Sequence, residues 1–324
     1  NFYFLKCSPL RAGGFGWDAI TPHHGIVARV SADGKKFDVF AHGARAPNGL
    51  AIGPDDRLSV SDNEGDWVPT SRLSFVREGD FLGVPELAHG PRPTDYGRPA
   101  LWLPHDKVDN SSGGQAWVPA GGRWGPFGES LLHLSYGRAA LFLVMDEEIG
   151  GVRQAGAVRF PLKFESGIMR ARFNPADGQL YVCGFKGWQG DARRDGALQR
   201  VRYTGKPVAL PTALHVKTGR IEITFAQPLD PKAAADAANF AVERWTYQWT
   251  KAYGSPEFSV ARPGEKGHDP VEVRGAQLLA DGRTVALDIP SLAPVMQMKI
   301  GVAIRALDGT PIECEIFNTI ARVP

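Results

Sequence analysis

The 324-residue sequence has little cysteine, little charge imbalance and no long apolar run. Its three cysteines, Cys7, Cys183 and Cys314, lie too far apart for a disulfide framework or a zinc knuckle, and no Cys-x-x-Cys-His motif for c-type haem occurs. The 37 basic and 35 acidic residues leave a net charge of +2, which argues against a nucleic-acid partner. Apolar runs such as 139–145 have the length of strands, so no membrane span is expected in this segment.

Glycine and proline are abundant by contrast. The 38 glycines and 25 prolines make 63 of 324 residues, close to a fifth, against roughly 12% in average usage. Helical periodicity is nearly absent, and residues 230–240, with Pro231 in a first turn, are the one helix expected. Short β-rich runs joined by polar turns predict an all-β protein, with strands at 26–30, 37–41, 58–61, 131–135, 140–145, 168–173, 180–183 and 198–203.

One unit recurs along the first two thirds of the chain. A strand, an Asp-Gly turn and a second strand occupy 28–37 and 170–181, and 50–58 repeats the design with Asp56 in place of glycine. Asp-Gly favours a type I′ hairpin, because both central residues of that turn need a positive φ. Hairpins at this spacing predict a β-propeller with blades of about 40–50 residues.

The sequence predicts two domains. Residues 1–207 would supply about four propeller blades, and the strand-like opening without an initiator Met or signal peptide suggests that further N-terminal blades precede Asn1. Two prolines within 206–212 mark a linker, and residues 212–324 then alternate between apolar and polar residues at period two. A region of that size and pattern predicts a small immunoglobulin-like β-sandwich.

The segment 43–67 is the most informative for chemistry. Arg45 precedes one predicted strand, and an oxygen-rich turn follows the next, made of Asp62, Asn63, Glu64 and Gly65. A guanidinium suits carboxylates, and oxygen donors suit Ca²⁺, so the two loops could bind a metal and an anion at one mouth of a propeller. A structural ion pair at Arg45 and a solvated turn after it remain the alternative from spacing alone.

This run resembles the soluble quinoprotein glucose/sorbosone (aldose sugar) dehydrogenases, which read Arg-Asn-Pro-x-Gly-Leu, then a hairpin, then an acidic loop with glycine. Segments 77–85 and 125–138 are similar to further parts of that family, and the resemblance covers about residues 25–205. The chain resembles most closely a secreted bacterial subgroup often fused to cytochrome c modules. Its equivalents of that subgroup's motifs lie at 61–67, 184–188, 198–200 and 247–257.

The resemblance implies a six-bladed propeller holding pyrroloquinoline quinone (PQQ) and Ca²⁺, which oxidises a sugar hydroxyl or aldehyde by hydride transfer. It implies a periplasmic or secreted protein that passes electrons to a cytochrome, with haem only on a module outside this segment. Arg45 matches the arginine that contacts the quinone, and Arg138, Arg170 and Arg172 fall near the cations for its carboxylates. The calcium site falls on Asp62, Asn63, Glu64 and Gly65.

The sequence also departs from the family. Ala46 replaces an asparagine, Glu64 and Gly65 replace a Gly-Pro pair, and the family's catalytic histidine belongs to a blade that would precede Asn1. None of the eight histidines takes that role by position, and His133 is expected in a turn or at the surface. The segment is therefore expected to be catalytically incomplete.

Two other functions remain open. The chain could be a non-catalytic module that binds glycan or a protein partner, or a calcium-dependent lactonase-like hydrolase. Trp245, Tyr247 and Trp249 could stack on sugar rings, although a role in the core is favoured. Asp109, with Asp106 and Asn110, could bind a cation or simply form a turn, and Cys183 is expected to be buried.

Overall fold

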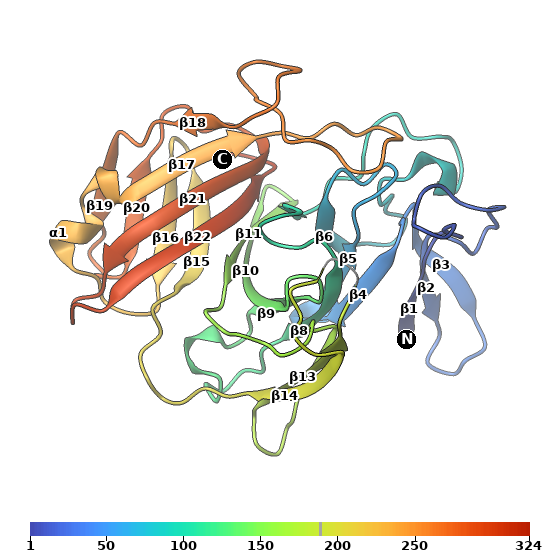
Figure 1. Cartoon of the computed structure of the whole chain (residues 1–324), viewed down its shortest axis with the longest axis horizontal. Coiled ribbons are helices and arrows are strands. Elements are labelled where there is room, and N and C mark those ends of the chain that lie inside the picture. Colours follow the sequence, from blue (N-terminus) through green and yellow to red (C-terminus); the bar gives the residue numbers. More distant parts are fainter. Residues whose placement is uncertain (188–189) are drawn as a thin grey trace.

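Nearly all of the regular secondary structure of the described residues is β-strand (Figure 1). The computed structural model describes residues 1–187 and 190–324, so Trp188 of the 184–188 motif lies outside it. One short α-helix, α1 (Pro231–Ala234), occurs in these residues, and Asp230 caps it by accepting a 2.8 Å hydrogen bond from the Ala233 amide. The remaining turns of helix are 3₁₀, namely η1 (Pro54–Asp56), η2 (Pro85–Leu87), η3 (Gly125–Phe127) and η4 (Ala237–Asn239). The all-β expectation and its single short helix are confirmed.

Four antiparallel meanders fill the first two thirds of the chain. The first contains β1 (Phe2–Lys6), β2 (Ile26–Val30) and β3 (Phe37–His42). The second contains β4 (Pro47–Ile52), β5 (Leu58–Asp62), β6 (Ser71–Val76) and β7 (Leu101–Leu103). The third contains β8 (Ser112–Trp117), β9 (Leu131–Ser135), β10 (Ala140–Ile149) and β11 (Val152–Arg159). The fourth contains β12 (Arg170–Phe173), β13 (Leu180–Phe185) and β14 (Gly196–Val201).

The first strands of these meanders pack in series. β1 contacts β4, β4 contacts β8, and β8 contacts β12. Blades of a propeller meet along their innermost strands in this way, so the arrangement is propeller-like. β1 and β12 stand at the two ends of the series.

The C-terminal third forms two further sets of strands. One sheet has the order β15-β16-β20-β19, from β15 (Pro211–Lys217), β16 (Arg220–Phe225), β20 (Thr284–Asp288) and β19 (Gly275–Leu278). The other set has the order β18-β17-β21-β22, from β18 (Asp269–Val271), β17 (Phe240–Trp245), β21 (Val295–Arg305) and β22 (Pro311–Ile320). Both sets share one hydrophobic core with the third meander, which includes Leu143, Leu214, Ile223, Ile300 and Ile316.

One sheet runs through both parts of the chain. β22 pairs with β11, with Gly156 opposite Asn318, so the third meander and the C-terminal strands make a continuous eight-stranded sheet. Figure 1 shows β10, β11, β22 and β21 side by side. The two predicted domains are therefore joined by backbone hydrogen bonds as well as by the segment 202–210. Their boundary and the immunoglobulin-like class stay predictions.

Two local predictions were wrong. In the turn at Asp33 and Gly34 only the glycine has a positive φ, +73°, so this is no type I′ turn. Positive φ at both central residues occurs instead at Asp55 and Asp56, with values of 59° and 57°. Cys183 is exposed rather than buried, because it lies on the open face of the sheet β12–β14.

Alternate connections of the meanders lie at one end of the sheets. Because neighbouring strands are antiparallel, the loop before β4, the β5–β6 loop and the β7–β8 loop all fall at the end where β4 begins. We call this end the rim. Its segments are 7–25, 43–46, 63–70, 104–111, 136–139 and 160–169. All residues predicted to bind a metal or cofactor lie in these rim segments or near the rim ends of the strands β5 and β12.

Candidate functional site

Arg45 lies buried at the rim, in contact with the turn that follows β5. Its Nη1 donates a 2.7 Å hydrogen bond to the Glu64 carbonyl, and its Nη2 donates a 2.5 Å bond to the Gly14 carbonyl. The ring of Tyr253 stands over the guanidinium, 4.9 Å from Cζ. The structure thus brings Arg45 and the predicted oxygen-rich turn together. Both terminal nitrogens of the guanidinium, however, donate to backbone carbonyls.

Asp62 anchors the loop that carries Arg45. Its two carboxylate oxygens accept 2.7 Å hydrogen bonds from the amides of Arg45 and Ala46. Burial raises the pKa of Asp62, and the two amides and the buried Arg72 partly oppose that rise. Asp62 is opposite Arg72 in the β5–β6 ladder, and burial lowers the pKa of that arginine to about 10.

Glu64 contacts a histidine on a neighbouring loop. One of its carboxylate oxygens lies 2.9 Å from His105 Nδ1, and this hydrogen bond raises the pKa of His105. Arg138 in turn donates a 3.1 Å bond from Nη2 to the His105 carbonyl. The Gly65 carbonyl accepts a 3.2 Å bond from the Gly254 amide. Three rim loops and a C-terminal segment therefore meet around Glu64.

The four predicted calcium ligands do not fit a Ca²⁺ ion. Each already has a protein partner: both Asp62 oxygens, the Asn63 amide, and the carbonyls of Glu64 and Gly65 accept or donate hydrogen bonds within the chain. Within residues 1–187 and 190–324, no group of three histidine, cysteine, aspartate or glutamate side chains is placed to hold a metal. Ca²⁺ takes six to eight oxygen ligands, and this turn leaves too few of them free.

Arg170 and Arg172 behave differently from Arg45. They lie two residues apart on β12, so their side chains leave the same face of the sheet. Arg170 donates 2.9 Å bonds to the Met169 carbonyl and to Asn48 Oδ1, and Arg172 donates one of 2.7 Å to the Ala171 carbonyl. No ion pair links either to a carboxylate in the described part of the chain. Burial, and the like charge of Arg172, lower the pKa of Arg170.

Polar residues at the starts of three inner strands connect this arginine pair to the rest of the rim. Asn48 on β4 donates a 2.7 Å bond to the Ser112 carbonyl on β8 and accepts the bond from Arg170 on β12. The Ser112 amide donates a 2.7 Å bond to Asn63 Oδ1. Asn48 and Ser112 were not among the predicted site residues, and only the observed strands β4 and β8 bring them together.

A buried cluster at the rim corrects the expectation for His133 and bears on the alternatives for Asp109. His133 is fully buried, not superficial, and its Nε2 lies 2.5 Å from Asp109 Oδ2. Asp109 also accepts bonds of 2.7 Å from Ser112 Oγ and 2.6 Å from Ser135 Oγ. Since its oxygens are engaged in this network, Asp109 serves as a structural anchor, and the cation site considered there does not form around it.

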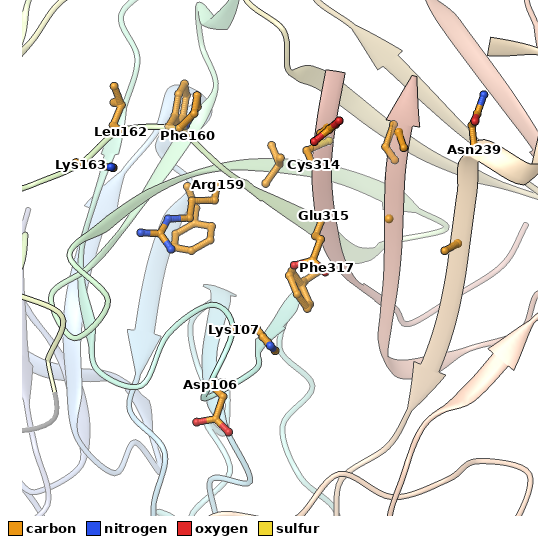
Figure 2. Close-up of a pocket in the computed structure, with 18 of the residues that line it drawn as sticks. Asp106, Lys107, Arg159, Phe160, Leu162, Lys163, Asn239, Cys314, Glu315 and Phe317 are labelled. Atoms are coloured by element: carbon orange, nitrogen blue, oxygen red, sulfur yellow. The ribbon is translucent and has the colours of Figure 1, made fainter. Parts of the chain in front are cut away.

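A hollow of about 970 Å³ is lined by none of the four arginines predicted to bind the cofactor. It crosses the face of the eight-stranded sheet over β10, β11, β22, β21 and β17, and Asp106 and Lys107 stand at one end (Figure 2). Phe142 and Phe317 line its floor, while Arg159 and Glu315 carry opposite charges at its wall. Of the residues that the sequence analysis considered for a cofactor or metal, Asp106 alone lines it.

Solved structures are similar to the chain, whereas no family model and no curated protein matches it. One of these structures is an oxidoreductase described as a glucose dehydrogenase from Thermus thermophilus, at 19% identity and a TM-score of 0.39, covering 55% of each chain. Another is the PQQ-bound form of an aldose sugar dehydrogenase from Streptomyces coelicolor, at 20% identity and a TM-score of 0.40, covering 55% of this chain and 52% of that one.

These structural neighbours are sugar dehydrogenases. The chain spans about half the length of each. Similarity at this level does not assign the chain to a family, so its activity is inferred from its own residues below. None of the helices in the described ranges is long and apolar enough to cross a lipid bilayer.

Proposed function

We propose that this chain is part of a quinoprotein sugar dehydrogenase-like protein in which an anionic quinone such as PQQ binds at Arg170 and Arg172. The observation that carries the proposal is the pair itself: two neighbouring guanidinium groups with no carboxylate partner in the described residues. Two like charges held side by side repel each other, and a bound polycarboxylate removes that repulsion. The resemblance of segments 43–67 and 125–138 to the quinoprotein sugar dehydrogenases also supports an anionic quinone as the ligand.

The chain's residues would bind and orient such a ligand. Arg170 and Arg172 each keep N–H groups free for two-point contacts with carboxylates, and Asn48 holds Arg170 in place from β4. Arg138 offers a third cation at the rim, although it also faces Asp106 and Asp191 at 3.5 and 3.7 Å. Bound PQQ would supply the acceptor for the hydride of a sugar hydroxyl or aldehyde. Arg45 would act on the shape of the rim rather than on the ligand.

We also propose the finer assignments that accompany this function. Residues 1–207 would be the C-terminal blades of a six-bladed propeller, supported by the serial packing of β1, β4, β8 and β12. Residues 212–324 would be an immunoglobulin-like sandwich, supported by strand orders that match the ABED and C′CFG sheets of that fold. The protein would be periplasmic or secreted and would reduce a cytochrome whose haem lies outside this segment.

A PQQ titration tests the proposal. Tryptophan fluorescence of the 324-residue chain should be quenched saturably by PQQ, with and without added Ca²⁺, because the oxygens of residues 62–65 are engaged by hydrogen bonds within the chain. The double variant Arg170→Ala/Arg172→Ala should lose this quenching. A control variant, Arg262→Ala/Arg274→Ala, removes the same charge from exposed positions in the C-terminal part of the chain and should titrate like the wild type. Unsaturable quenching, or equal quenching in the first double variant, overturns the proposal.

The second candidate is a non-catalytic module that binds glycan. The observation favouring it is that the polar groups of Arg45 and of the turn 62–65 form hydrogen bonds within the protein. Saturable glycan binding without any quinone response would support it. The same hydrogen bonds occupy the oxygens that a calcium ion would need, and they therefore argue against the lactonase-like hydrolase, which requires calcium at the rim.

A further inference from the structure

An exposed pair of aromatic rings stands at the rim. The rings of Phe15 and Tyr253 lie 4.7 Å apart at 44°, and the two residues are 65% and 42% exposed. Of the aromatic residues that the sequence offered for sugar stacking, Trp245 and Tyr247 are buried in the core and hydrogen bonded to each other. The third, Trp249, packs against Trp67 with ring centroids 4.9 Å apart and donates a 2.7 Å bond to the Gly83 carbonyl. An aromatic pair left open to solvent beside charged groups is suited to holding a ligand that has one apolar face.

Tyr253 comes from the C-terminal part of the chain. It lies in a segment, residues 246–258, that reaches over the rim loop 63–70, and we call this segment the strap. The Trp67 amide donates a 3.1 Å bond to the Thr250 carbonyl, and the Gly254 amide donates a 3.2 Å bond to the Gly65 carbonyl. These backbone bonds fix the strap on both sides of Tyr253.

Gly254 explains how the strap comes so close. Its φ of +66° suits glycine, and a Cβ there would lie 2.6 Å from Glu64 Oε1. The Glu64 carboxylate therefore lies directly beside the residue that follows Tyr253. His105 is bound to the other oxygen of that carboxylate. Hydrogen-bonding groups are thus adjacent to the aromatic rings.

Arg45 connects the two halves of the platform. Its guanidinium lies under the Tyr253 ring and donates to the Gly14 carbonyl, one residue before Phe15. The platform is therefore built from two segments more than 200 residues apart and held by one buried cation. Such fixed rings lose little further freedom when a ligand binds.

We propose that Phe15 and Tyr253 form a stacking platform for the pyranose ring of an aldose. The C–H face of a sugar is apolar and packs on aromatic rings, while its hydroxyl edge accepts and donates hydrogen bonds, which Glu64 and His105 can provide. The inference rests on the proposed function for the choice of a sugar as the ligand. It adds the residues that would bind that sugar.

Saturation-transfer NMR with D-glucose on the 324-residue chain tests the platform. Irradiating aromatic protons should saturate the C–H protons of the sugar, and Phe15→Ala or Tyr253→Ala should weaken binding about 3- to 10-fold. Tyr253→Phe keeps the ring and should bind as the wild type does. Matched controls are Phe2→Ala, at 63% exposure, and Tyr203→Ala, at 36%, because both remove an exposed ring away from the rim.

The outcomes separate this inference from the proposed function. Glucose binding is measured with and without PQQ, and PQQ quenching of Tyr253→Ala is measured in parallel. Loss of glucose binding with intact quenching supports the platform. Glucose binding that Phe15→Ala and Tyr253→Ala leave unchanged overturns it, as does an absence of glucose binding in both conditions. Absent quenching with intact, ring-dependent glucose binding overturns the proposed function alone.

Discussion

Arg45 donates a hydrogen bond of 2.7 Å to the carbonyl of Glu64, nineteen residues further along the chain. The contact brings the two halves of the sequence motif to one place at the rim. It also uses the carbonyl that would otherwise be available to a metal ion. The same contact that supports the fold of the site therefore argues against calcium binding at residues 62–65.

Removing Arg45 should destabilise the protein and relieve a constraint on Gly65. A Cβ at Gly65 would lie 1.8 Å from Arg45 Nε. Arg45→Ala should cost about 2–4 kcal/mol in the free energy of unfolding, because it removes a buried side chain and leaves two partly buried carbonyls unpaired. Gly65→Ala should cost about 1–3 kcal/mol alone and clearly less in the Arg45→Ala background. Urea unfolding of the wild type, both single variants and the double variant measures the coupling, and additive costs would contradict the contact.

Anions should stabilise the protein through Arg170 and Arg172. At a concentration ten times its dissociation constant, a bound anion such as sulfate adds about 1.4 kcal/mol to the free energy of unfolding. The melting temperature should rise in sulfate relative to chloride at equal ionic strength, and Arg170→Ala/Arg172→Ala should remove that rise. An unchanged sulfate effect in the double variant would locate the anion elsewhere. Without sulfate the double variant should melt near the wild type, since both side chains are exposed.

The pair His42 and His89 should make stability depend on pH. Their rings stack at 5.3 Å, and burial together with the charge of His89 lowers the pKa of His42. In the unfolded chain the pKa of His42 is about 6.5, so this histidine binds a proton more readily there than in the folded chain, and its contribution to stability falls as the pH drops below about 6.5. Unfolding in urea between pH 5 and pH 8 checks this, and His42→Gln should show a shallower fall. An equal slope in both proteins would rule out His42 as the cause.

Asp109 should be worth far more to stability than its neighbour in sequence, Asp106. Asp109→Ala leaves His133, Ser112 and Ser135 without their shared buried acceptor and should cost about 3–5 kcal/mol. The Asp106 side chain is 86% exposed, so Asp106→Ala should change stability by no more than about 0.5 kcal/mol. Thermal unfolding followed by circular dichroism distinguishes them, and similar losses would refute the anchoring role of Asp109.

Strand positions were predictable because they depend on local patterns. Residues 26–30 and 131–135 are strands with the predicted bounds, since apolar residues at these places alternate or cluster between turn-forming residues. The pairing of β22 with β11 was not predictable, because it joins residues more than 150 positions apart and no local pattern names the partner. The same limit hid the burial of His133, which depends on the distant strands that cover it.

Local chemistry in the chain determined that the protein is built of short strands, that one helix starts at Pro231, and that Arg45 and Glu64 belong to one site. Only the tertiary structure decided how the polar atoms of that site are used. Hydrogen-bond partners come from whichever segments pack nearby. The Gly14 carbonyl accepts a bond from Arg45, and the Gly254 amide donates one to the Gly65 carbonyl, although both partners are distant in sequence. That Arg170 and Arg172 have no acidic partner in the described residues also follows only from the tertiary structure, because it depends on which segments pack beside β12.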